Sequence, residues 1–195
     1  MLFLTKGSGK RVRFKLIFNM IETPRLLLRA FIDEDAEGIF LLDADPEVHR
    51  YLGNQPITAL QKAVEIIQHV QGQYLTNGIG RWAVLEKATG EFVGWAGLKY
   101  EQHHVTGERY YDLGYRLRRK FWGRGIASEV AAVWIEYGFE RMNLTEIGAA
   151  AHIENAASNR ILQKSGFEAI NTFDSHGATH NWYILRRETW RGGSQ

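Results

Sequence analysis

The sequence predicts one α+β domain in which antiparallel strand pairs precede a single strand–helix–strand crossover. The 195 residues are 45% hydrophobic and 12% aromatic, which is enough to bury a core without disulfide or metal support. Short apolar runs bounded by glycine alternate with segments of helical spacing. We find no internal repeat, low-complexity tract or linker. We therefore expect a basic extension at 1–19, one domain at 20–190 and a C-terminal tail at 191–195.

Turn and capping signals predict the elements of the first half. The Thr23-Pro24 turn opens a strand, and the acidic residues that follow favour the N-terminus of a helix. Apolar residues at helical spacing predict a longer helix, which Asn77-Gly78 ends. Two strands then pair across a loop. In order, these segments are a strand at 25–31, helices at 33–43 and 60–77, and strands at 81–86 and 92–100.

The second half holds the crossover. A strand runs directly into a basic loop with two glycines, and the helix after it begins with small residues that permit close backbone approach. A strand, a helix closed by Gly166 and two more strands follow. Because a helix joins the strands on either side of the loop, they form a strand–helix–strand unit. These segments are strands at 110–117, 145–152, 167–173 and 181–187, and helices at 127–138 and 156–164.

Charge and cysteine content exclude several protein classes. The net charge is +2, but residues 1–20 hold five basic and no acidic side chains, so the rest of the chain carries −3. The absence of cysteine excludes a disulfide scaffold, a thiolate zinc site and a cysteine nucleophile, and it fits a reducing compartment. The apolar run at 2–4 is too short for a signal peptide or a membrane span. We expect a cytoplasmic protein.

The loop before the crossover helix is a candidate anion site. A helix N-terminus offers unpaired N–H groups and a partial positive charge, and Gly123 and Gly125 would let phosphates approach the backbone. The spacing fits neither a Walker A loop nor a dinucleotide fingerprint, so an ordinary strand-to-helix turn is the alternative interpretation. The four basic residues that suit a ligand with several phosphates are Arg118, Arg119, Lys120 and Arg124.

Three segments resemble signatures of the GNAT acetyltransferases, particularly the RimJ/RimL branch. Residues 122–129, Trp-Gly-Arg-Gly-Ile-Ala-Ser-Glu, resemble the acetyl-CoA pyrophosphate loop, with Trp122 where the superfamily usually has Gln or Arg. Asn155-x-x-Ser158 with residues 161–167 is similar to the second signature, and residues 21–29 are similar to the branch's opening strand. The resemblance implies a mostly antiparallel, twisted sheet of about seven strands and about four flanking helices. Two parallel strands would splay around the cofactor.

The resemblance implies direct transfer of the acetyl group of acetyl-CoA to a primary amine, either a protein N-terminal amino group or a small molecule. The strand before the loop would hold the pantetheine arm, the loop backbone the pyrophosphate, and the next helix the far side of the cofactor. A backbone N–H near Leu117 would stabilise the thioester oxyanion. The implied cofactor contacts are Tyr115, Arg116, Leu117, Trp122, Gly123, Arg124, Gly125, Ile126, Ala127, Ser128, Asn155 and Ser158.

The reaction needs a base, because an alkylamine is mostly protonated at neutral pH. Asp112 lies where relatives often carry a glutamate and is the candidate general base. The alternative is a surface carboxylate on a hairpin. Leu162 occupies the place of the tyrosine that usually serves as general acid, which leaves Tyr183, Ser158 or water as substitutes.

Substrate contacts are expected from the first two helices and the last hairpin, with Tyr51, Tyr74, His152 and His176 as candidates. The histidines lack the spacing of known zinc motifs, so we expect no metal. The expected partner is the amine substrate, with no nucleic acid or membrane, and the chain would act as a monomer or homodimer. The alternative is a non-catalytic module of the same fold that senses CoA or binds nucleic acid through its basic residues.

Overall fold

The centre of the fold is an eight-stranded sheet in the order β1-β2-β3-β4-β5-β6-β8-β7. The computed structural model describes residues 20–102, 107–175 and 177–192. Neighbouring strands are antiparallel except β5 and β6, which are parallel. The strands are β1 (Ile21–Glu22), β2 (Leu26–Arg29), β3 (Trp82–Glu86), β4 (Phe92–Gln102), β5 (Arg109–Leu117), β6 (Glu146–His152), β7 (Glu168–Ser175) and β8 (Ala178–Arg186).

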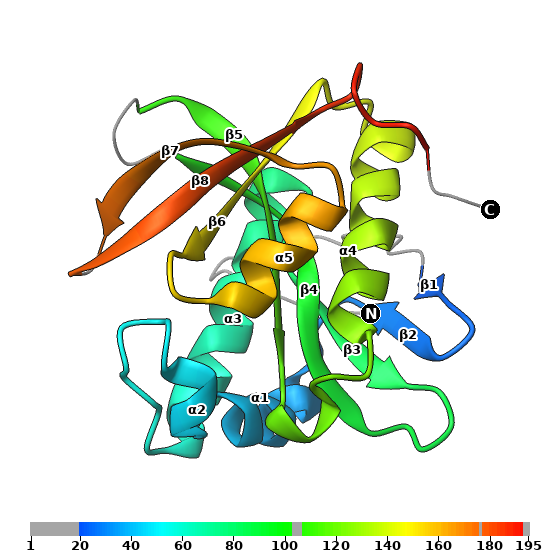
Figure 1. Cartoon of the computed structure of the whole chain (residues 1–195). Helices are drawn as coiled ribbons and strands as arrows, with labels where there is room; N and C mark the ends of the chain where they lie inside the picture. Colours follow the sequence, from blue (N-terminus) through cyan, green and yellow to red (C-terminus); the bar gives the residue numbers. More distant parts are fainter. Residues whose placement is uncertain (1–19, 103–106, 176, 193–195) are drawn as a thin grey trace, which may run out of the picture.

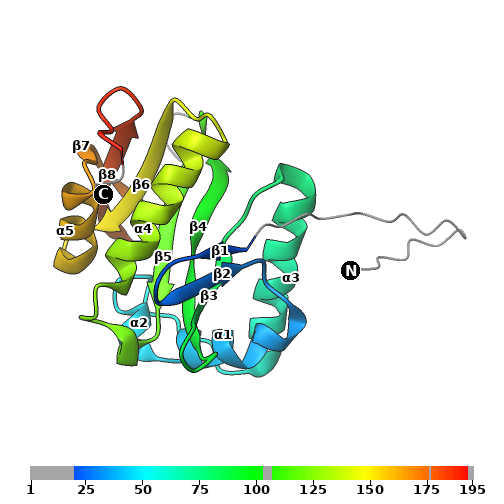
Figure 2. The same cartoon turned by 90° about the vertical axis from the view of Figure 1, so that its right-hand side faces the viewer.

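Helices cover both faces of this sheet. Figures 1 and 2 show α4 and α5 on one face and α3 on the other, with α1 and α2 at the lower end of the view in Figure 1. A 3-10 turn precedes α1, and a π turn continues α4. The five helices in the described part of the chain are α1 (Ala36–Asp43), α2 (Pro46–His49), α3 (Leu60–Asn77), α4 (Ile126–Glu136) and α5 (Ala156–Lys164).

The predicted fold class is confirmed. The sheet is mostly antiparallel with one parallel pair, and α3 has the predicted bounds, ending at Gly78 in the left-handed conformation (φ 70°). The sheet has one strand more than expected, and the described residues form one helix more than expected. Both additions are short, since β1 has two residues and α2 has four, and so neither shows a measurable hydrophobic period.

Buried aromatic side chains form the core between the sheet and α4. The rings of Trp82 and Trp134 meet edge to face at 5.0 Å, in the geometry that aromatic pairs prefer. Tyr74 of α3, on the opposite face of the sheet, is also buried, with only 3% of its surface exposed. Its hydroxyl donates to the carbonyl oxygen of Arg81 and accepts from the N–H of Phe31 at 3.2 Å. The core therefore ties α3 to β3 and to the segment after β2.

The parallel strands β5 and β6 meet at one register position and then separate. The pairing joins Asp112 to Gly148, and the arrows of β5 and β6 end apart in Figure 1. Gly148 is required here, because a Cβ on it would lie 2.5 Å from the ring of Trp182 and 2.7 Å from the ring of Tyr110. Beyond this point the two strands separate, as the resemblance to the GNAT acetyltransferases implies. None of the described helices is long and apolar enough to cross a bilayer.

Candidate functional site

The loop between β5 and α4 presents backbone rather than side chains. Gly123 and Gly125 have φ values of 72° and 75°, which favour glycine. A Cβ on Gly123 would meet no described atom within 4 Å, so the space beside the loop is open. Gly125 is the N-cap of α4, and among the described residues no side chain caps this helix. The N–H groups of its first turn are thus directed at an open surface that suits an anion.

Two contacts attach this loop to the sheet. The indole Nε1 of Trp122 donates to the carbonyl oxygen of Leu117 at 2.8 Å, and the backbone N–H of Arg118 donates to the oxygen of Val93 at 2.9 Å. Phe121 is buried between them, whereas 46% of Trp122 is exposed. The predicted cofactor residues Leu117 and Trp122 are therefore in direct contact.

Each basic side chain of the loop is paired within the protein. The four nitrogen-to-oxygen pairs, three of them at 2.8–3.2 Å, are Arg118 with Glu91, Lys120 with Glu91, Arg119 with Asp45, and Arg124 with Glu86. The lysine next to Glu91 holds the pKa of that carboxyl below its usual range. An anion at this loop would therefore depend on the backbone N–H groups, because all four basic side chains are paired with carboxylates.

The side chain of Tyr115 connects β5 with α5 on the side where β5 and β6 separate. Its hydroxyl donates to the backbone oxygen of Ser158 at 3.5 Å, so these two predicted cofactor residues face each other across the gap between β5 and α5. Burial raises the pKa of Tyr115 to about 12. Asn155, the third predicted residue here, is the N-cap of α5 and accepts from the N–H of Ser158 at 3.1 Å.

Asn159 is a buried connector that the sequence reasoning missed. Its Nδ2 donates to the backbone oxygens of His152 and Asn155 at 2.9 and 2.8 Å, and its Oδ1 accepts from Tyr183 and Asn181 at 2.8 Å. The hydroxyl of Tyr183 is used in this contact, and only 1% of the residue is exposed. The suggestion that Tyr183 replaces the missing general acid is therefore not supported by its position. Leu162, at the usual acid position, lies in the core.

Asp112 forms a shielded ion pair with Arg81, where the alternative interpretation expected a surface carboxylate. Side-chain exposure is 17% for Asp112 and 9% for Arg81. The Arg81 guanidinium also donates to the backbone oxygens of Asp112 and Gly97. Burial raises the pKa of Asp112, and Arg81 and Lys99 oppose that rise. The arrangement needs Gly114, because a Cβ there would lie 2.5 Å from Nη2 of Arg81.

Arg81 carries no sequence motif, and it precedes β3 by one residue. The signal that could have identified it is the pair of glycines that face each other across β4 and β5, Gly97 and Gly114. Two opposed glycines leave room on a sheet for a long side chain from a neighbouring strand. The Arg81 guanidinium occupies that room and lies 5.4 Å from the ring of Trp95.

A second ion pair lies on the same face of the sheet. Nη1 of Arg116 is 2.7 Å from the buried carboxylate of Asp43, at the end of α1. Nε2 of His49 is 3.6 Å from the same carboxylate. Burial, followed by the nearby Arg116 charge, holds the pKa of His49 below its usual range. The side chain of Arg116 thus ties β5 to the end of α1, and His49 of α2 contacts the same carboxylate.

The predicted substrate residues are only partly brought together. The rings of Tyr51, after α2, and His152, at the end of β6, are 5.3 Å apart, and His180 of β8 is 5.5 Å from His152. Tyr74 lies in the core, away from this group, so its position does not favour contact with a substrate. His176 lies outside the described residues. The segment after α2, the end of β6 and the last hairpin therefore meet, as expected for an acceptor site.

The described residues contain no group of three or more His, Asp or Glu side chains that could hold a metal ion. The site therefore consists of a backbone loop, a splayed strand pair, a shielded ion pair and an aromatic surface.

Comparison with known proteins identifies the family of this site. The acetyltransferase (GNAT) domain family matches residues 25–168. The chain belongs to the GNAT acetyltransferase family. A relative from Bacillus subtilis, described as the uncharacterized N-acetyltransferase YoaA, is 36% identical over 153 residues, which are 78% of this chain and 84% of that protein. The GNAT assignment and the prediction of an acyltransferase enzyme are confirmed.

Two solved structures share the fold at low sequence identity. The ribosomal-protein-S5-alanine acetyltransferase from Vibrio fischeri has a TM-score of 0.69 at 18% identity, covering 89% of this chain and 99% of that one. The spermidine N-acetyltransferase from Vibrio cholerae, in complex with CoA and spermine, has a TM-score of 0.69 at 17% identity, covering 86% and 98%. The equal scores do not distinguish the two types, so the RimJ/RimL branch stays a prediction.

Proposed function

We propose that this GNAT enzyme transfers the acetyl group of acetyl-CoA directly to a primary amine, without a covalent enzyme intermediate. The observation that carries the proposal is the uncapped glycine loop of α4, which lies at the end of β5 where β5 has separated from β6. Family membership indicates the reaction class. The loop, with open space beside Gly123 and no basic side chain left unpaired, fits a pyrophosphate held by backbone N–H groups.

The residues that would hold acetyl-CoA lie on two elements. The backbone of β5 at Tyr115, Arg116 and Leu117 would hold the pantetheine arm, and the backbone from Gly123 to Ser128 the pyrophosphate. Asn155 and Ser158 would bound the other side. Acetyl-CoA supplies an activated acetyl thioester, and a backbone N–H near Leu117 would stabilise negative charge on its carbonyl oxygen.

Asp112 would take the proton of the attacking amine, directly or through water. Asp112 is the residue at which β5 pairs with β6, directly before the two strands separate. An amine that attacks an acetyl group held between the separated strands would pass close to this carboxylate. Arg81 opposes the effect of burial and favours the ionised form. A positioned base typically contributes ~10²- to 10⁴-fold to the rate.

The acceptor would enter between the segment after α2 and the β7–β8 hairpin, beside Tyr51 and His152. In His152, Nδ1 accepts from the N–H of Glu154 at 3.1 Å, so the neutral ring carries its proton on Nε2. This leaves Nε2–H as a donor at the acceptor surface. Spermidine and a ribosomal protein are the amines named for the two structural neighbours, so we include both classes in the test.

A thiol-release assay tests the proposal. The panel contains peptides with free N-termini, polyamines, amino acids and aminoglycosides, each with acetyl-CoA. We expect thiol release that requires both acetyl-CoA and an amine, and mass spectrometry should find the acetyl group on nitrogen. Failure to bind acetyl-CoA in a thermal-shift titration would contradict the proposal. Steep salt-dependent binding to DNA or RNA without turnover would instead support the non-catalytic alternative, which the paired basic residues of the loop disfavour.

A further inference from the structure

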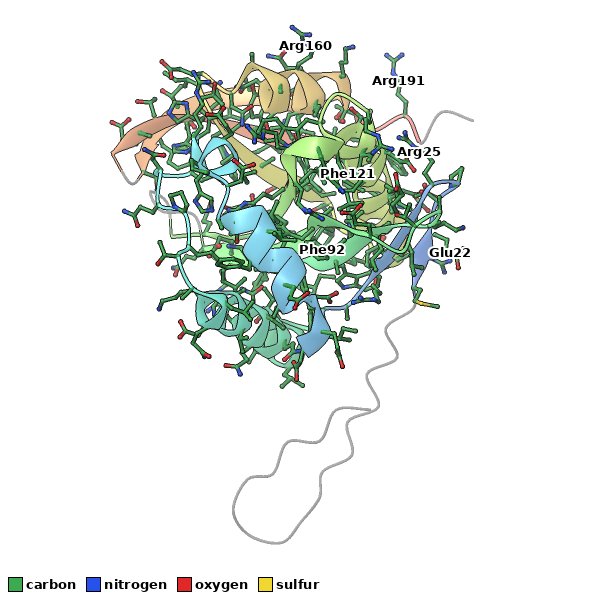
Figure 3. All side chains as sticks on the ribbon, turned by 90° about the horizontal axis from the view of Figure 1, so that it is seen from below. Glu22, Arg25, Phe92, Phe121, Arg160 and Arg191 are labelled. Carbon is green, nitrogen blue, oxygen red and sulfur yellow. The ribbon has the colours of Figure 1, made fainter. Side chains whose placement is uncertain are left out.

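One arginine from the β1–β2 turn contacts the loop that opens α4. Nε of Arg25 donates to Oε2 of Glu129 at 2.8 Å, and Nη2 donates to the same oxygen. Nη1 donates to the backbone oxygen of Arg124 at 2.9 Å, across 99 positions of sequence. Figure 3 shows Arg25 on the side of the molecule where Phe121 of this loop lies. A single guanidinium thus joins the start of the sheet, the loop and the first turn of α4.

Glu129 creates an electrostatic problem for an anionic ligand. It lies in the first turn of α4, where a carboxylate stabilises the helix but repels any other anion at the same terminus. Its Oε1 is buried and has no hydrogen-bond partner among the described residues. Arg25 holds the other oxygen. The cation that balances Glu129 is therefore Arg25.

The contact with Arg124 fixes the direction of a peptide group. In a trans peptide the carbonyl oxygen and the following N–H point in opposite directions. Because the Arg124 oxygen is directed at Arg25, the N–H of Gly125 is directed away from Arg25. Nη2 of Arg25 would lie 3.8 Å from a Cβ on Gly125, and no other described atom lies within 4 Å of that Cβ. Arg25 therefore sets the side of the loop to which the Gly125 N–H points.

We propose that Arg25 is a positioning residue for acetyl-CoA, acting through Glu129 and the Arg124–Gly125 peptide without contacting the reacting atoms. The inference rests on the proposed function of this loop. Without Arg25, Glu129 presents an unbalanced charge beside the pyrophosphate, and the Arg124 carbonyl is free to turn toward the same space. Both changes weaken cofactor binding and leave the amine chemistry at β5 intact.

A double-mutant cycle measured by CoA titration calorimetry tests this role. Arg25→Gln should raise the Kd for CoA about fivefold, the size expected when the Glu129 charge at this partly exposed helix N-terminus loses its balancing cation. Glu129→Gln alone should change the Kd less than about threefold, because it removes the repulsion together with the partner. The double variant should recover the part of the lost affinity that Glu129 causes, and the remaining loss comes from the freed Arg124 carbonyl. In turnover, Arg25→Gln should raise KM for acetyl-CoA while kcat changes less than about twofold.

Matched controls separate this role from general stability. Lys87→Gln removes another ion pair of the same region, with Glu22 at 2.7 Å, and should leave the Kd unchanged. Arg25→Lys keeps the positive charge but loses the planar guanidinium that contacts both Glu129 and Arg124, so this variant should bind CoA with intermediate affinity. An unchanged Kd for Arg25→Gln, or a double variant as weak as Arg25→Gln alone, would overturn the inference. Failure of the unmutated protein to bind CoA would instead overturn the proposed function.

Discussion

Replacing Gly114 with alanine tests whether the Arg81–Asp112 pair organises the centre of the sheet. The new Cβ would lie 2.5 Å from Nη2 and 2.8 Å from Cζ of Arg81. Real Cβ contacts are not that short, so we expect the guanidinium to move away from the new methyl group. It would then lose the Asp112 carboxylate and the backbone oxygen of Gly97. The substitution removes a buried contact although neither charged residue is changed.

The expected loss of stability follows from the shielding of this pair. Breaking a buried ion pair costs about 3–5 kcal/mol. The exposure of Asp112, 17% of its side chain, lets water replace part of the contact and favours the lower end of that range. Replacing glycine by alanine returns about 0.4–1 kcal/mol by reducing the entropy of the unfolded chain. The net loss is about 2–3 kcal/mol, which lowers Tm by about 4–12 °C in a domain of this size.

Calorimetry and kinetics on one preparation test this prediction. Gly72→Ala in α3 is the matched control, because its Cβ meets no described atom within 4 Å, and it should raise stability by about 0.5–1 kcal/mol. With Arg81 displaced, kcat should also fall, since the largest charge that opposes the effect of burial on the pKa of Asp112 is then removed. The reasoning is refuted if Gly114→Ala unfolds at or above the Tm of the unmutated protein with an unchanged kcat.

Three further changes give separate tests. Gly125→Glu should abolish CoA binding in a titration, whereas Gly90→Glu, at a similar φ of 74°, should bind normally; equal affinities would show that the loop is misassigned. Asp112→Asn should lower kcat about 10²-fold or more with CoA affinity nearly intact, and full activity would remove Asp112 from the mechanism. Burial and Arg116 lower the pKa of His49, so the unfolded chain binds that proton more tightly and stability falls as pH drops through about 6.5. His49→Gln should flatten this dependence in thermal unfolding between about pH 5 and 7, and an unchanged slope would contradict the assignment.

The elements that the sequence predicts well are those with local signals. The bounds of α3 follow from its hydrophobic period and from Gly78. Gly78 ends the helix by adopting the left-handed conformation, which depends on no residue distant in the sequence. The short α2 also has local signals, since Pro46 is its first residue and Asp45 accepts from the N–H of Glu47 at 3.0 Å. Four residues are too few to show a hydrophobic period, and without such a period the proline and the capping aspartate do not by themselves predict a helix. Tyr74 shares the apolar period of α3, which points to the core position that the structure shows.

The candidate site also contains a part that local sequence predicts and a part that depends on contacts between distant residues. The glycine loop was predicted because its conformation depends on consecutive residues. The pairing of Asp112 with Arg81 was missed because the residues are 31 positions apart and meet only through the register of three strands. The carboxylates that neutralise the loop come from outside the loop, and Glu86 and Glu91 flank the β3–β4 turn. Local sequence therefore predicts where an anion can bind, and the sheet topology determines which charges surround it.

The position of Trp122 makes the protein its own optical reporter. This indole is held at the mouth of the loop by its bond to Leu117 while nearly half of it faces solvent. The indoles of Trp82 and Trp134 are enclosed in the core, so their emission contributes a constant background. A molecule that settles on the loop changes the polarity around Trp122 without reaching Trp82 or Trp134. Because an exposed indole emits at longer wavelength than a buried one, a change at the red edge of the fluorescence spectrum would record occupancy without a label or a chemical step.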